Sequence, residues 1–318
     1  MNSLTGLQIL ATGRSVPSVC VSNEELSKRV ETSDEWIYTR TGIRQRYFCA
    51  PEETNALLAV RAARAALQKA GLEPQQIGLC VCGTFSPDHA SPSLACEVHE
   101  QLGLPENTPA FDVNAACTGF LTALETARCF LTASELQSPY ALVIGSECIS
   151  RVMDHEDRAT CVLFGDGAGA AVVRLSDAHP YRAVLHARGD VELLKVGGAG
   201  RPDQVVQMQG SAVFRFASEV VPACINELLE KSGMTMEDID YVVCHQANGR
   251  IIDHVIKKLG APPEKFYKNM QRYANTSAAS IPIALDEMAE AGLLHPGQRV
   301  LCVGFGAGLT WGGALLTV

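Results

Sequence analysis

The 318-residue sequence predicts an α/β protein built from two similar halves. Short apolar segments alternate along the chain with longer segments of helical periodicity, and the second half repeats the order of the first. Such alternation favours largely parallel sheets that are covered by helices. Apolar residues make up 47% of the chain and charged residues 19%, which is typical of a globular protein with a substantial core.

Local signals support each expected element of the first half. Residues 6–11 predict a short strand, and residues 22–25 resemble a helix cap. Residues 54–70 predict a helix that ends at Gly71, because glycine readily adopts the left-handed conformation that ends helices. Further strands are expected at 77–83, 141–145 and 163–174, and a further helix at 91–102.

An internal repeat divides the chain into halves at 1–175 and 176–318. Residues 71–82 match residues 233–244 without a gap. A repeat this long is not a solenoid unit and instead predicts two α/β halves about a pseudo-twofold axis. Three shorter matches follow in the same order: 116–118 with 274–276, 142–145 with 301–304, and 167–173 with 312–318.

The repeat also predicts a site. Cys117 aligns with Asn275, and Gly83 aligns with His245. If the equivalent loops of the two halves converge near the axis, a thiol, an imidazole and an amide share one cleft. Cys117 precedes a helical segment, so we expect the helix N-terminus to shift it toward thiolate. Taken one at a time, a buried structural cysteine, a structural histidine and a helix cap at Asn275 remain alternatives.

Composition excludes several functions. A net charge of −9 argues against general nucleic-acid binding, and no apolar run reaches the ~18 residues of a membrane span. The twelve cysteines form no paired zinc pattern. With no leader segment, we expect free thiols in a reducing cytoplasm. The glycine-rich segments 165–169 and 304–308 lead into strands, so we interpret them as close backbone approaches and not as nucleotide-binding loops.

Basic and aromatic residues gather in two places. Trp36 with Arg40, Arg44 and Arg46 suggests an exposed cluster, to which Arg158 adds a charge. Such a cluster suits a ligand with phosphates and a stackable base, although a solvated surface is the alternative for each arginine alone. The second place is a basic patch on one expected helix, formed by Arg250, Lys257 and Lys258.

Taken together, these segments resemble the β-ketoacyl-acyl carrier protein synthase III family, the initiating condensing enzymes of bacterial type II fatty acid synthesis. The resemblance runs from end to end and implies the thiolase fold, two duplicated halves in five α-β-α-β-α layers, and a homodimer. The segments that carry it are 32–37, 39–44, 115–120, 164–170, 245–248, 275–280 and 305–311.

The resemblance implies an acyltransferase that needs no metal or redox cofactor. Cys117 would take an acyl group from acyl-coenzyme A, with the main-chain N–H groups of Cys117 and Ala307 as the oxyanion hole. His245 and Asn275 would then stabilise the enolate formed when malonyl-acyl carrier protein loses carbon dioxide. The carbanion attacks the acyl-cysteine and gives a 3-oxoacyl-carrier protein.

The resemblance also assigns binding residues. Ser91 stands where acetyl-restricted relatives carry a bulky aromatic that floors the partner subunit's acyl pocket, so we predict a pocket that admits longer or branched primers. The residues expected at coenzyme A are Thr32, Trp36, Arg40, Arg158, Gly210, Phe214 and Asn248, and those expected at the acyl carrier protein are Gln246, Ala247, Asn248, Gly249 and Arg250.

Other functions remain open at this point. A condensing enzyme of secondary metabolism would use the same three residues with other acyl or malonyl donors. A thiolase would bring a second active-site cysteine, and no suitable one is found near Gly306. A cysteine hydrolase would release free acid without a malonyl donor, and a non-catalytic binding protein would not acylate Cys117.

Overall fold

The computed structural model describes residues 6–198, 200–201 and 203–318. Two β-sheets form its framework, and they share one strand order: β1-β7-β6-β4-β5 in the first and β8-β13-β12-β11 in the second. The strands of the first sheet are β1 (Leu7–Ser15), β4 (Ile77–Gly83), β5 (Ala110–Val113), β6 (Tyr140–Glu147) and β7 (Gly167–Leu175). Those of the second are β8 (Arg182–Asp190), β11 (Tyr241–Cys244), β12 (Arg299–Gly306) and β13 (Gly308–Thr317).

The pairing directions repeat as well. β6 runs parallel to β4 and antiparallel to β7, just as β12 runs parallel to β11 and antiparallel to β13. A parallel bridge from Val242 to Phe266 takes the place that β5 holds in the first sheet. The first sheet comes from residues 7–175 and the second from 182–317. The division of the chain near residue 175 remains a prediction, and residues 1–5 of the expected first half lie outside the described residues.

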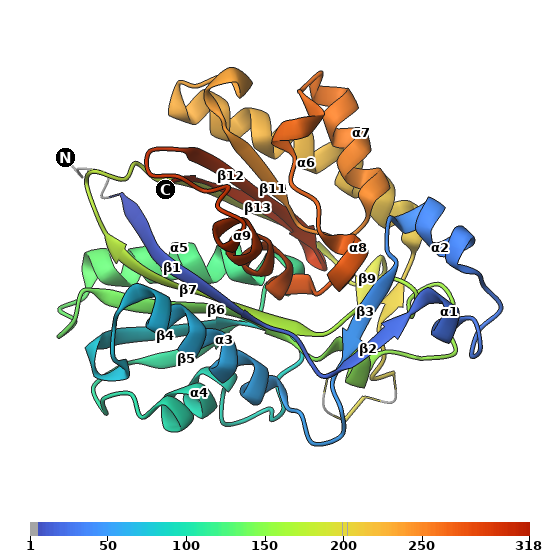
Figure 1. The fold of residues 1–318 in the computed structure, drawn as a ribbon, viewed down its shortest axis with the longest axis horizontal. Coiled ribbons are helices and arrows are strands. Elements are labelled where there is room, and N and C mark those ends of the chain that lie inside the picture. Colours follow the sequence, from blue (N-terminus) through green and yellow to red (C-terminus); the bar gives the residue numbers. More distant parts are fainter. Residues whose placement is uncertain (1–5, 199, 202) are drawn as a thin grey trace.

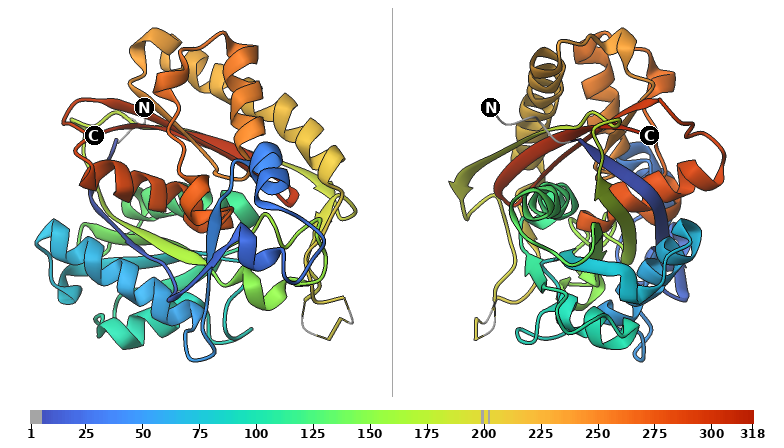
Figure 2. Two further views of the ribbon diagram at one scale, coloured as in Figure 1. Left: turned by 45° about the vertical axis from the view of Figure 1, so that its right-hand side comes forward. Right: turned by 90° about the vertical axis from the view of Figure 1, so that its left-hand side faces the viewer.

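Helices and sheets alternate in five layers (Figure 1). The middle layer contains α5 (Gly119–Ala133) and α9 (Ser280–Glu290), which contact both sheets. Figure 2 shows the same layers from two other sides. The outer layers are α3 (Asn55–Ala70) with α4 (Leu94–Leu102) on the first sheet, and α6 (Gly210–Ser232) with α7 (Gly249–Leu259) on the second.

The two halves share one apolar core. Leu121 and Leu124 of α5 lie in the same buried cluster as Ile281 and Leu285 of α9. The cluster continues into both sheets, because the inner face of each sheet packs on this helix pair. All seven residues of β4 are buried, as expected for a strand that is covered on both faces. The rigid middle layer thus fixes the loops that precede α5 and α9.

A smaller unit lies at one side of the five layers, on the right in Figure 1. It contains the antiparallel pair of β2 (Val19–Ser22) and β3 (Gln45–Phe48). Between these strands in sequence lie α1 (Asn23–Leu26) and α2 (Asp34–Thr41), and α2 contacts α7. The other helices and strands are α8 (Met270–Tyr273) and the short pair β9 (Leu194–Lys195) and β10 (Gln207–Met208).

Most sequence-based boundaries are confirmed, and three shift. The strand expected from residue 163 begins at Gly167. α3 begins after its Thr54 cap and ends at Gly71, whose φ is 65°. The helix expected from residue 91 begins at Leu94, because the Ser93 hydroxyl caps it. β1 continues to Ser15, since it pairs with β7 along that whole length. Within the described residues, no helix is both long and apolar enough to cross a membrane.

Candidate active site

Cys117 lies in the turn that joins β5 to α5, in a short 3₁₀ segment directly before the helix. The preceding residue, Ala116, has a φ of 46°, a backbone conformation that residues other than glycine rarely adopt. Such strain is typical of functional sites, where the surrounding structure holds it in place. The Cys117 side chain is buried, with 8% of its surface exposed.

Asn275 occupies the equivalent turn of the second half. The residue before it, Ala274, also has a positive φ, of 58°. The main chain of Asn275 is fixed by two hydrogen bonds, in which its N–H donates to Leu163 (2.9 Å) and its carbonyl accepts from Gly165 (3.0 Å). Its side-chain Oδ1 accepts the N–H of Ser277 at 2.9 Å. Because Oδ1 is engaged in this way, the amide is oriented and its Nδ2 is the group that can donate to a substrate.

His245 follows β11, and its main-chain N–H donates to Val303 at 2.7 Å. Burial lowers the pKa of the imidazole to about 3, so the ring is neutral at physiological pH. Its Nδ1 lies 2.7 Å from the hydroxyl of Ser280. That hydroxyl also accepts the N–H of Gln246 at 3.3 Å, and it can donate its own hydrogen to Nδ1. In that tautomer the imidazole proton is on Nε2, and His245 is a neutral hydrogen-bond donor.

The surroundings of Cys117 correct one prediction. Burial raises the pKa of the thiol to about 12, and the nearby Glu147 charge raises it further, while a hydrogen bond with Ser277 lowers it. The thiol is therefore protonated in the resting protein, and the expected shift toward thiolate is wrong. Loss of water around the sulfur outweighs the helix N-terminus at this position. Attack by Cys117 must include removal of its proton.

Glu147, at the end of β6, was missed by the sequence analysis. Its carboxylate is fully buried and accepts from Thr84, Ser86 and the main chain of Phe85 on one oxygen. The other oxygen accepts the hydroxyl of Ser277 at 3.2 Å. Burial raises the pKa of Glu147 to about 7, although these hydrogen bonds oppose the shift. An acid whose pKa lies near neutral pH is thus bonded to Ser277, the same residue that lowers the pKa of the Cys117 thiol.

Two cavities meet at Cys117. The first, of about 360 Å³, is lined by Cys117, His245 and Asn275 together, so the structure brings the three predicted residues into one cleft. The second, of about 310 Å³, is lined by Cys117, Ala307 and Phe85, and most of its other lining residues are apolar or glycine. A thioester bound at the sulfur can therefore extend in two directions, one toward each cavity.

Gly306 explains the glycine-rich turn after β12. A Cβ on this residue would lie 2.8 Å from the main-chain nitrogen of Cys117, closer than any side chain permits. The absence of a side chain lets the turn approach Cys117, and the next residue, Ala307, then lines the second cavity. The assignment of the Cys117 and Ala307 N–H groups as an oxyanion hole remains a prediction.

The mouth of the first cavity carries the expected aromatic and basic cluster. The guanidinium of Arg40 lies 4.5 Å from the centroid of the Trp36 ring, and that of Arg158 lies 5.0 Å from it. Gly210, Phe214 and Asn248 line the same cavity with these three. Arg46 was wrongly expected in the cluster: it is fully buried and donates to Asn23 and to main-chain carbonyls. Arg44 instead stacks on Tyr38 and pairs with Asp34.

Several other predicted residues lie away from the cavity surface. Gln246 is buried, and its amide bonds to the main chain of Cys244, Tyr267 and Asn269. Gly249 is buried against the main chain of α2. A partner protein cannot reach either residue in this structure, so the prediction that both contact the carrier protein is wrong. Of that predicted set Ala247 lines the cavity, Asn248 is half-buried and only Arg250 is exposed.

Two further predicted residues, Thr32 and Ser91, also line neither cavity. Thr32 is half-buried in the loop before α2, and Ser91 is exposed in the loop before α4. Their roles at coenzyme A and in an acyl pocket across a dimer remain predictions. Arg215, on α6 beside the cavity mouth, was missed because a lone arginine on a helix carries no motif.

Comparison with known proteins places this geometry in a family. Residues 111–189 match the model of 3-oxoacyl-[acyl-carrier-protein] synthase III, and residues 229–318 match the model of its C-terminal part. The two matched stretches contain Cys117, His245 and Asn275.

Relatives cover nearly the whole chain. A β-ketoacyl-[acyl-carrier-protein] synthase III of Clostridium acetobutylicum is 44% identical, over 98% of this chain and 99% of the relative. The crystal structure of 3-oxoacyl-[acyl-carrier-protein] synthase III from Aquifex aeolicus VF5 aligns with a TM-score of 0.93 and 41% identity, over 98% of this chain and 100% of that one. The priming β-ketosynthase of the R1128 polyketide pathway aligns with a TM-score of 0.91 and 37% identity, over 98% and 96%.

Two duplicated halves, one shared cleft and full-length similarity thus agree, and this chain belongs to the 3-oxoacyl-[acyl-carrier-protein] synthase III family and has its thiolase fold.

Proposed function

We propose that this enzyme condenses an acyl-coenzyme A primer with malonyl-acyl carrier protein and so starts fatty acid synthesis. The observation that carries the proposal is the single cavity in which Cys117, His245 and Asn275 meet. A thiol beside two neutral hydrogen-bond donors suits a thioester exchange followed by formation of an enolate. Membership of the family supports the same reaction.

In the first half-reaction, Cys117 attacks the thioester carbonyl and coenzyme A leaves with a proton. The thiol proton needs an acceptor, because the pKa of the resting thiol is about 12. We assign this role to Glu147, reached through Ser277, whose hydroxyl donates to Glu147 at 3.2 Å and is near enough to the sulfur to lower the pKa of the Cys117 thiol. His245 is a poor base, since burial holds the pKa of its imidazole at about 3.

In the second half-reaction, malonyl thioester occupies the first cavity. Nε2–H of His245 and Nδ2–H of Asn275 donate to its thioester carbonyl, which becomes an enolate as the carboxylate leaves as carbon dioxide. Neutral donors suit this step, because they strengthen their hydrogen bonds as negative charge develops and need no proton transfer. The carbanion then attacks the acyl-Cys117 carbonyl, and the thiolate is the leaving group.

The cavity mouth suits the two carriers of the acyl groups. Trp36 with Arg40 and Arg158 offers stacking and positive charge to the nucleotide end of coenzyme A. Arg250 and Arg215 are exposed beside the cavity, with Lys258 near them, in a chain whose net charge is −9. A local basic patch on an acidic protein suits an acidic partner, and we assign it to the carrier protein.

We also propose a homodimer and a cytoplasmic location. The dimer rests on the family resemblance, in which the loop carrying Ser91 reaches the neighbouring acyl pocket. The location rests on the twelve cysteines, which are all free thiols in the described chain.

The test is incubation with a series of acyl-coenzyme A primers and malonyl-acyl carrier protein, with product masses read directly. The proposal predicts 3-oxoacyl-carrier protein with primers longer than acetyl. Free acid without any condensation product would indicate a hydrolase instead.

A second candidate is priming in a secondary pathway, favoured by the similarity to the R1128 priming β-ketosynthase. Replacing malonyl-acyl carrier protein by malonyl-coenzyme A distinguishes the two. Turnover that is as fast with malonyl-coenzyme A would favour an acceptor that is not bound to a carrier.

A further inference from the structure

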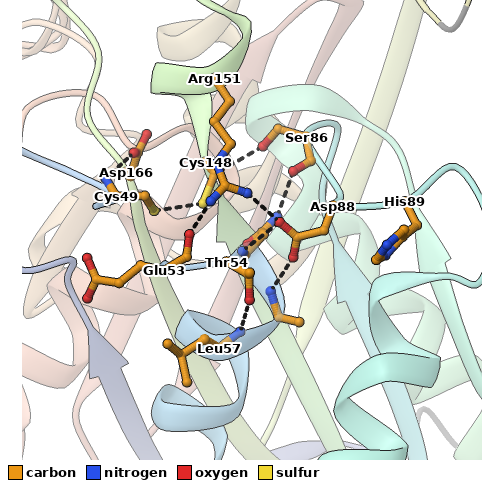
Figure 3. A network of polar contacts seen from close by, with 12 residues as sticks. Cys49, Glu53, Thr54, Leu57, Ser86, Asp88, His89, Cys148, Arg151 and Asp166 are labelled. Atoms are coloured by element: carbon orange, nitrogen blue, oxygen red, sulfur yellow. Dashed lines mark hydrogen bonds and ion pairs between the residues drawn. The ribbon is translucent and has the colours of Figure 1, made fainter. Parts of the chain in front are cut away.

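Two thiols outside the active site lie in direct contact. Cys49 follows β3 and Cys148 follows β6, and their Sγ atoms are 2.9 Å apart although they are 99 residues apart in sequence. Figure 3 shows the two sulfurs facing each other within a network of polar side chains. A disulfide needs an Sγ–Sγ distance of about 2.05 Å, so a small movement would join them.

The main chain holds each cysteine at this contact. The N–H of Cys49 donates to Asp166 at 2.8 Å, and the N–H of Cys148 donates to the hydroxyl of Ser86 at 2.9 Å. These anchors come from different parts of the first half, so the approach of the sulfurs does not depend on one flexible loop. Groups held together in this way react as if at very high concentration.

A metal site fits the same residues less well. Asp166 completes a group of three potential ligands with the two cysteines. Its carboxylate is already engaged, because it accepts from the N–H of Cys49 and from both the N–H and the hydroxyl of Ser150. Tetrahedral zinc with Zn–S bonds of about 2.3 Å would hold two sulfurs roughly 3.8 Å apart. The sulfurs are closer than that, so the geometry favours a bond between them.

The two thiols differ in their exposure to solvent. Cys49 is partly exposed, whereas Cys148 is 1% exposed. The contact with Cys49, together with burial, raises the pKa of the Cys148 thiol. Cys49 is therefore the thiol that meets a small oxidant first, and Cys148 is the one placed to complete the bond.

We propose that Cys49 and Cys148 are a redox modification site, at which hydrogen peroxide produces a reversible intramolecular disulfide. The Cys49 sulfur attacks one peroxide oxygen, the O–O bond breaks, and the departing hydroxide takes the thiol proton as water. The Cys148 sulfur then attacks the resulting sulfenic acid, and the S–O bond breaks as the S–S bond forms. The second water leaves with the Cys148 proton, so two electrons pass from the sulfurs to peroxide. A dithiol reductant returns the pair to thiols.

The disulfide would lie close behind the catalytic loops. Cys148 directly follows Glu147, which bonds to Ser277, and the loop of Asp166 bonds to Asn275 through Gly165. Cross-linking residues 99 positions apart constrains the unfolded chain. We therefore expect the oxidised protein to melt several degrees higher than the reduced protein, with Cys117 still a free thiol.

Peptide mapping tests the proposal. The full chain is treated with peroxide, alkylated and digested with trypsin, which cuts after arginine and places Cys49 in residues 47–61 and Cys148 in residues 129–151. Cys129 shares the second peptide, so the experiment uses the Cys129→Ser variant, in which an exposed thiol is removed. The expected product is these two peptides linked, with the mass of two hydrogens lost, and separated again by dithiothreitol.

Matched variants make the outcome decisive. In Cys148→Ala the linked pair disappears and Cys49 is trapped by a sulfenic-acid reagent. Cys49→Ser, at the partly exposed position, removes the pair without altering a buried site and should also abolish the rise in melting temperature. Oxidation of Cys96 or Cys117 under conditions that leave 47–61 and 129–151 unlinked would overturn the proposal, as would tight zinc binding by the reduced pair that prevents its oxidation.

Discussion

The hydroxyl of Ser280 offers the sharpest test of how His245 works. It lies 2.7 Å from Nδ1 of the imidazole and accepts the N–H of Gln246, and by donating its own hydrogen to Nδ1 it would place the imidazole proton on Nε2. Ser280→Ala removes the only group among the described residues that is hydrogen-bonded to that ring. The neutral ring is then free to adopt the other tautomer, in which Nε2 cannot donate to the malonyl carbonyl.

The size of the effect follows from the lost hydrogen bond. A buried polar group that loses its partner costs about 1–3 kcal/mol, which corresponds to a roughly 5- to 150-fold decrease in the rate of decarboxylation. Acyl transfer to Cys117 should change little, because that step does not use the Nε2 proton. The two half-reactions can therefore be measured separately. Intact-mass analysis follows acyl loading, and the release of carbon dioxide follows decarboxylation.

Thr276→Val is the matched control. Thr276 is in the same loop as Asn275, and its hydroxyl is buried without a hydrogen-bond partner in the described structure. Removing it keeps the side-chain shape and leaves no group unpaired, so both half-reactions should proceed at nearly the wild-type rate. Equal losses of loading and decarboxylation in Ser280→Ala, or no loss of decarboxylation, would refute the positional role of Ser280.

Three further predictions concern the acid, the nucleotide end and the carrier surface. The raised pKa of Glu147, about 7, means that its ionisation costs stability as pH rises from its unfolded value near 4.5 through 7. Glu147→Gln should remove about 3 kcal/mol of this loss of stability, so that the unfolding free energy changes less with pH. The same variant should slow acyl loading. An unchanged pH profile of the unfolding free energy would contradict the assignment. Trp36→Ala should raise KM for acyl-coenzyme A about tenfold, with little effect on KM for malonyl-acyl carrier protein, because only the nucleotide end stacks there. Arg250→Glu should do the reverse, raising KM for the carrier protein in a salt-dependent way, and equal effects on both substrates would argue against separate surfaces.

The sequence predicted that Cys117, His245 and Asn275 converge, because the internal repeat carries spatial information. Equivalent strand ends meet at the pseudo-axis, and the positive φ values of Ala116 and Ala274 show that the repeat extends to the backbone of the two turns. The alignment of Cys117 with Asn275 therefore predicted that the two residues lie in equivalent turns that face each other across the pseudo-axis. The strand orders of the two sheets follow from the same repeat.

Burial was the quantity that the sequence could not supply. Arg46 is close in sequence to the exposed Arg44 yet is wholly buried, and Gln246 directly follows His245, which lines the cavity, yet is itself buried. The protonated state of Cys117 has the same origin, because desolvation depends on every element that surrounds the sulfur. The contact of Cys49 with Cys148 joins two strand ends that no motif relates.

The most direct test of the central claim is intact-mass analysis of the enzyme after acyl-coenzyme A and again after malonyl-acyl carrier protein. We predict a single acyl adduct on Cys117 that disappears as 3-oxoacyl-carrier protein forms. In His245→Ala and Asn275→Ala the adduct should form and persist, and in Cys117→Ser it should be absent. Adduct turnover at the wild-type rate in both His245→Ala and Asn275→Ala would contradict the account.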